Sequence, residues 1–73
     1  MAAQNVESEV TGNVWKIEVA VGDTVEEEDV IMILESMKME IPVEAPCAGK
    51  IAKILVAEKD HVSEDQLIAV IET

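Results

Sequence analysis

The sequence predicts an all-β fold, a small sandwich or barrel of short strands. Trp15, Ile17 and Val19 are separated by charged residues, and an apolar period of two is typical of strands that have one face in water. The same alternation recurs over residues 40–45, and no segment shows the apolar spacing of a helix. Turn-forming residues separate the apolar runs, as a chain of short strands requires.

An internal repeat divides the chain into two copies of one unit. Residues 6–36 align with residues 43–73 at an offset of 37, and 12 of the 31 pairs are identical. Similarity at a fixed offset indicates two copies of one supersecondary unit. Because so short a chain can build only a small core, we expect residues 1–73 to form one pseudo-two-fold domain. Residues 37–42 join the two copies, so we expect them at one end of the domain and the chain termini near the other.

The longest apolar runs predict the central strands. Residues 30–34 and 67–71 are rich in Ile and Val and are bounded by acidic residues, or on one side by Gln66, which favours strands buried on both faces. Turns are expected between the runs, at Gly12, at Gly49 and over residues 21–23 and 58–60.

Composition and charge exclude several classes of protein. Asp and Glu number 16 against 5 basic residues, for a formal net charge of -11. This balance disfavours nucleic acid and anionic membranes as partners, since phosphate binding depends on Lys and Arg. Five-residue apolar runs are far shorter than the roughly 20 residues of a membrane span. The N-terminal residues lack the basic and apolar regions of a signal peptide, so we expect a cytoplasmic protein.

The junction between the repeats holds a lysine in an unusual setting. Met37 and Met39 flank Lys38 directly, and Glu35 and Glu40 lie further out. Methionine is adaptable and is common at binding surfaces, although in a hairpin one of the two could pack inward instead. A lysine at the tip of a connection between strands is accessible to the active site of another protein.

Residues 35–40, Glu-Ser-Met-Lys-Met-Glu, resemble the Met-Lys-Met attachment motif of biotinyl domains in the biotinyl/lipoyl superfamily. The length, the repeat and the central lysine match as well, most closely those of small free-standing biotin/lipoyl attachment proteins of bacteria. The resemblance implies a flattened barrel or sandwich of two antiparallel four-stranded sheets, with Lys38 at a hairpin tip. Only Ala20 and Val21 lie between Val19 and Gly22, as in carriers without the protruding thumb of some bacterial acetyl-CoA carboxylase subunits.

The resemblance also implies a function for Lys38 and its neighbours. A biotin protein ligase would join biotin to the Lys38 amine as an amide, with Met37 and Met39 as ligase contacts and Glu35, Ser36 and Glu40 flanking them. The tethered biotin would carry carboxylate between biotin carboxylase and carboxyltransferase subunits, for example of an acyl-CoA carboxylase. The chain is then a monomeric carrier and a substrate of the ligase, with no catalytic or metal-binding residues of its own.

Three other functions remain open. A lipoyl group on the same lysine is one, although lipoyl domains usually carry Asp-Lys-Ala at the tip. An unmodified module that binds through acidic faces, such as residues 26–29, is another. Phosphopantetheine on Ser36 is disfavoured, because such carriers are helical; many biotinyl domains have Ala or Val at this position.

The remaining chemically active side chains predict structural roles. His61 and Cys47 are single residues of their kind, too few for a zinc site of four protein ligands, and one cysteine excludes an internal disulfide. We expect His61 on a surface turn and Cys47 as a small buried apolar residue. Trp15, the only aromatic residue, is expected to pack on one side of the two-fold or to lie half exposed.

Overall fold

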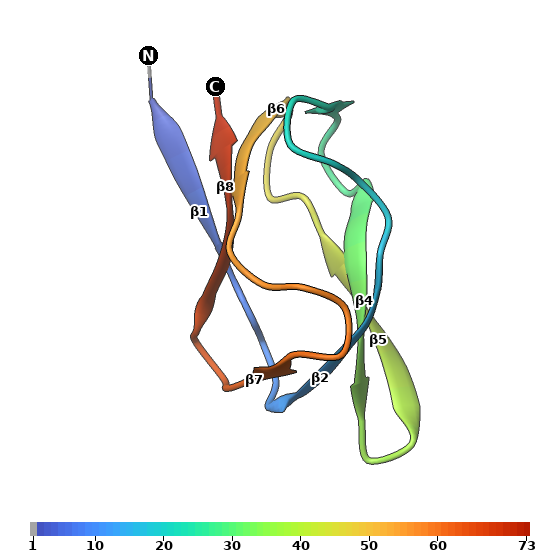
Figure 1. Cartoon of the computed structure of the whole chain (residues 1–73). Helices are drawn as coiled ribbons and strands as arrows, with labels where there is room; N and C mark the ends of the chain where they lie inside the picture. Colours follow the sequence, from blue (N-terminus) through green and yellow to red (C-terminus); the bar gives the residue numbers. More distant parts are fainter. Residues whose placement is uncertain (1) are drawn as a thin grey trace.

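The computed structural model describes residues 2–73 and contains two four-stranded sheets packed face to face (Figure 1). The predicted all-β fold is confirmed. The first sheet has the order β1-β8-β6-β3 and the second β5-β4-β2-β7, and every neighbouring pair is antiparallel. The strands are β1 (Ala3–Glu7), β2 (Gly12–Ile17), β3 (Thr24–Val25), β4 (Val30–Ser36), β5 (Met39–Glu44), β6 (Gly49–Ile54), β7 (His61–Val62) and β8 (Leu67–Glu72). The two sheets do not join into a closed barrel, so the flattened sandwich is the correct description.

The two sheets are built from corresponding strands of the two repeats. Moving along the chain by 37 residues takes β2 onto β6 and β3 onto β7 without any shift in their bounds. The turns correspond too, because Asp23 accepts a hydrogen bond from the Ala20 amide and Asp60 accepts one from the Ala57 amide, both at 2.9 Å. Aspartate side chains commonly close turns in this way, which explains why this residue is identical in both halves.

The hydrophobic core lies between the sheets and is filled mainly by Val and Ile. Its fully buried side chains come from strands of both sheets, and they include Val14, Ile31, Leu34, Ile51, Val62, Ile68 and Ile71. The expectation that residues 30–34 and 67–71 are buried on both faces is wrong in part. Val30 is exposed and Val70 is half buried, because a two-layer sandwich leaves the outer face of each sheet in contact with water.

Gly12 and Gly49 do not form turns as expected, but begin β2 and β6. A Cβ atom on Gly12 would clash with the carbonyl oxygen of Glu35, and one on Gly49 would lie 2.6 Å from that of Glu72. Both are therefore glycine because a neighbouring strand passes too close for a side chain. The positions correspond in the repeat, so the close approach occurs once in each sheet.

The chain termini and the β4–β5 hairpin lie at opposite ends of an elongated molecule (Figure 1). The amide of Thr73 donates a 2.9 Å hydrogen bond to the carbonyl of Ala2, which brings the two ends together as the repeat predicted. The molecule measures 36 × 17 × 17 Å, so the hairpin projects along its long axis. Over residues 2–73, no helix is long and apolar enough to cross a membrane.

Candidate functional site

The β4–β5 hairpin places Lys38 at its tip. Ser36 pairs with Met39 across the two strands, which leaves Met37 and Lys38 as a two-residue turn. Residues 39–42, which the sequence placed in the attachment hairpin, belong to β5. The turn is consequently tighter than the junction of the repeats suggested, and it closes the hairpin at one end of the molecule (Figure 1).

Both turn residues adopt a left-handed backbone conformation. The φ angle is 51° at Met37 and 67° at Lys38, and positive values at both central residues are the mark of a type I′ turn. Such turns favour Gly, which has no Cβ atom, and Asn, whose short polar side chain hydrogen-bonds locally, whereas other residues are strained there by roughly 1–2 kcal/mol each. The pairing of β4 with β5 has to compensate for this strain. Backbone strain of this kind is common at functional sites. Neither Met nor Lys signals this turn type in the sequence.

The side chains at the tip are directed into solvent. Met37 is 91% exposed and Met39 is 62% exposed, so the alternative in which one of them packs into the core is wrong. Lys38 is exposed as well. Within residues 2–73, the only ion pair joins Lys16 to Glu18 at 3.5 Å, and the Lys38 amine is left available to a partner.

Ser36 anchors the base of the hairpin to the turn between β1 and β2. Its hydroxyl donates a 2.9 Å hydrogen bond to the carbonyl of Thr11. Next to Thr11, the missing side chain of Gly12 lets the backbone of Glu35 approach. The sequence did not single out Thr11 or Gly12 as supports of the site; the signal for Gly12 was its identity with Gly49 in the repeat.

Glu35 and Glu40 form an acidic pair next to the turn at the tip. They face each other in the β4–β5 register, and both are exposed. Like charges directly opposite each other across two strands are mildly destabilising. The tip therefore combines one cation, two exposed thioethers and two carboxylates, all of which a protein partner can contact.

The other candidate residues lie away from the tip. His61 is exposed, but it lies in β7 rather than on a turn, with its Nδ1 atom 3.3 Å from Oδ1 of Asn13. Cys47 is half buried against the core, close to its expected role, and Trp15 is 49% exposed. No three His, Cys, Asp or Glu side chains in residues 2–73 are placed to hold a metal ion.

The geometry of the tip fits a covalently attached acyl group. An amide on the Lys38 side chain needs a primary amine on a flexible stem with free space around it, and the exposed turn supplies both. The neighbouring side chains project outward, so a large group at this position would not disturb the core.

Comparison with known proteins identifies similar chains. A family model described as "Biotin-requiring enzyme" matches residues 2–71. The biotin/lipoyl attachment protein of Bacillus subtilis is 50% identical over 40 residues, which make up 55% of each chain. The biotinylated protein TB7.3 of Mycobacterium tuberculosis is 46% identical over 43 residues, or 59% of this chain and 61% of the relative. The matched segments thus span little more than half the length of these curated relatives.

Similar solved structures are parts of much larger proteins. A segment of the Kluyveromyces lactis urea carboxylase superimposes with a TM-score of 0.93 and 44% identity, covering 99% of this chain and 6% of that one. A single-chain, multi-domain long-chain acyl-CoA carboxylase gives a TM-score of 0.89 at 22% identity, covering 97% of this chain and 7% of that one. The second likeness supports the fold alone.

Proposed function

The chain belongs to the biotin/lipoyl family of biotin-requiring enzymes, and from this premise we propose that Lys38 carries a covalently attached biotin. The domain is a carrier rather than a catalytic unit, as in the attachment and biotinylated proteins that it resembles. One observation supports the site above all others. Lys38 lies in a strained, exposed two-residue turn at the end of the molecule opposite the termini.

The chemistry at Lys38 is the formation of an amide. The deprotonated Nζ atom attacks the activated carboxyl carbon of the biotin acyl donor, the bond to the leaving group breaks, and an amide to Lys38 remains. The attacking amine must first lose a proton, which we assign to a base of the ligase. Met37 and Met39 offer exposed thioethers to the ligase surface, and Glu35, Ser36 and Glu40 flank them. When attached, biotin supplies a ureido nitrogen that carries carboxylate.

The role of the protein is to present the modified lysine to successive active sites. Tethering raises the effective concentration of the attached group at each site, and the hairpin projects away from the body of the domain (Figure 1). The similarity to the Kluyveromyces lactis urea carboxylase supports biotin carboxylase and carboxyltransferase subunits as the partners. A lipoyl group is the second candidate, favoured by the similarity to a protein named for attachment of either group.

The test compares two exposed lysines that both have a left-handed backbone conformation. Lys59 is exposed and has a φ of 77°, so Lys59→Arg is a matched control for Lys38→Arg. We expect intact-mass measurement, after co-expression with a biotin protein ligase, to show one biotin on the wild-type chain and on Lys59→Arg. We expect none on Lys38→Arg, because the guanidinium is not an amine nucleophile.

Parallel co-expression with a lipoate ligase separates the two candidate groups. An adduct from the lipoate ligase alone would replace biotin by lipoate and leave the site unchanged. A biotin adduct retained by Lys38→Arg would refute the site. A wild-type chain modified by neither ligase would refute the carrier function and favour an unmodified acidic interaction module.

A further inference from the structure

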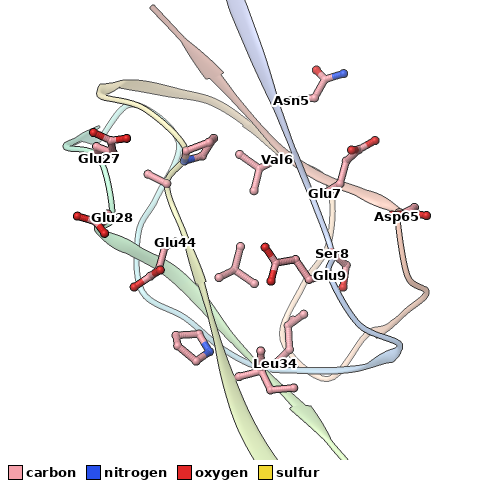
Figure 2. A pocket seen from close by; sticks show the side chains of 15 residues that line it. Asn5, Val6, Glu7, Ser8, Glu9, Glu27, Glu28, Leu34, Glu44 and Asp65 are labelled. Atoms are coloured by element: carbon pink, nitrogen blue, oxygen red, sulfur yellow. The ribbon is translucent and has the colours of Figure 1, made fainter.

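A groove of about 460 Å³ lies along the open side of the sandwich, between β1 and β5 (Figure 2). In the part of the chain that the structure describes, β1 pairs with β8 alone and β5 pairs with β4 alone. Each is therefore an edge strand that has backbone N–H and C=O groups without partners along one side. A closed barrel would use these groups to join the two sheets.

The groove has an apolar floor and an acidic rim. Val6, Leu34 and Val43 contribute to the floor. The residues that line the groove include no Lys or Arg. Its charged residues come from β1, from β5 and from turns of both repeats, and all of them are acidic: Glu7, Glu9, Glu27, Glu28, Glu44 and Asp65. In Figure 2, the side chain of Glu9 extends between the two strands, whereas Glu44 lies on the opposite side of the groove.

The repeat explains why both sides of the groove are acidic. Val6 corresponds to Val43 and Glu7 to Glu44 at the offset of 37 residues, and all four line the groove. The groove is therefore formed by equivalent segments of the two halves and shows the same chemistry to a ligand from either side.

The free part of each edge is limited by the turns. The Ser8 amide donates to the carbonyl of Gln66, and the Ala45 amide donates to that of Asp29, at 2.9 and 2.8 Å. These bonds occupy the backbone just beyond the ends of β1 and β5. Backbone available to a ligand thus lies within β1 and β5 themselves, which are long enough to pair with a short extended segment.

We propose that this groove binds a basic, extended segment of a partner protein, independently of any group on Lys38. Its cationic side chains would meet the acidic rim, its apolar side chains would meet the floor, and its backbone would add to an edge strand. A second copy of this chain is a poor occupant, because it would bring like charges together at a net charge of -11 per molecule.

The test uses a short peptide of alternating Lys and Val as the probe, titrated into the unmodified protein and followed by NMR of the backbone amides. We expect the largest shifts in β1 and β5. A peptide of alternating Lys and Pro carries the same charge but lacks half of the backbone donors, so we expect it to bind several-fold more weakly. A peptide of alternating Glu and Val should not bind.

Two double variants with equal changes in net charge complete the test. Glu9→Gln with Glu44→Gln should weaken binding of the Lys-Val peptide about fivefold, given the modest strength of exposed charge contacts. Glu18→Gln with Glu72→Gln, outside the groove lining, should weaken it less than twofold. Equal weakening by both pairs, equal binding of the Lys-Pro peptide, or shifts spread evenly over the surface would overturn the proposal in favour of diffuse attraction.

Biotin labelling distinguishes this proposal from the carrier function. The Glu9/Glu44 variant should accept biotin on Lys38 at the wild-type rate, because neither residue belongs to the hairpin tip. Failure of Lys38 to be labelled in the wild-type chain would refute the carrier function and leave the peptide titration unaffected.

Discussion

At the scale of single residues, the main feature of the molecule is the left-handed backbone of Met37 and Lys38. Lysine is required by amide chemistry, but neither residue is required by the turn, where Asn or Gly is the ordinary choice. The strain at these positions is compatible with a residue selected for contact with a partner rather than for stability. Stability and labelling should consequently respond in opposite directions to substitution of Met37.

Met37→Asn should raise the free energy of unfolding by about 0.5–1 kcal/mol, because Asn tolerates the left-handed conformation, and should slow labelling by the ligase. Urea denaturation measures the first effect and a time course of biotin incorporation the second. Met39→Asn is the control, since Met39 is exposed and lies outside the turn; it should change stability little and also slow labelling. A clear loss of stability in either variant would show that the side chain has packing contacts absent from this structure.

Ser36→Ala should lower the free energy of unfolding by about 0.5–1 kcal/mol by removing the hydrogen bond to the Thr11 carbonyl. It should also accelerate hydrogen exchange at the amides of the hairpin tip. Ser36→Thr keeps a hydroxyl and should restore part of the protection. Ser63→Ala, at an exposed loop serine, should leave the exchange at the tip unchanged, and an equal effect from it would argue against a specific anchor.

At the scale of elements, the sequence predicted the presence of strands better than it predicted where they begin and how they are connected. The alternation over residues 40–45 and the turns over residues 21–23 and 58–60 agree with the structure, because the period and the turn residues act locally. The alternation expected at Trp15 is wrong, because a bulge in β2 leaves Trp15 exposed and buries Val14. The turns predicted at Gly12 and Gly49 are wrong. A side chain is excluded at both positions by the close backbone of a strand that is remote in the sequence. The turn type at Met37 was unpredictable for the opposite reason, because its local preference is overridden by the pairing of β4 with β5.

The two equivalent glycines allow the support of the hairpin to be separated from that of the fold. Gly12→Ala and Gly49→Ala should each lower the free energy of unfolding by about 1–3 kcal/mol, because each places a methyl group against the backbone of a neighbouring strand. The affected backbone is at Glu35 in the first case and at Glu72 in the second. Only Gly12→Ala should slow biotin labelling at a temperature where both variants are folded. Equal labelling rates would show that the hairpin base does not position the tip.

At the scale of the whole molecule, the relevant fact is the separation of the tip from the termini along a 36 Å axis. Thr73 and Ala2 are hydrogen bonded to each other, so the two ends of the chain leave the domain together. A neighbouring domain joined at either end would lie away from Lys38. This arrangement is suited to a carrier whose modified end has to enter other active sites.

Circular permutation tests whether the closed turn at the tip is needed for attachment rather than for folding. A flexible linker of about four residues can join the adjacent termini, and the chain can be opened either between Val21 and Gly22 or between Met37 and Lys38. Both openings lie in exposed turns, where such changes are best tolerated. We therefore expect both permutants to be folded and to unfold cooperatively in urea.

The permutant opened at Val21 should be labelled like the wild type, because its hairpin is intact. The one opened at Met37 should lose labelling of the Lys38 side chain, because the strained turn that presents it is gone. Side-chain labelling at the wild-type rate in that permutant would show that the ligase reads the local sequence and not the turn.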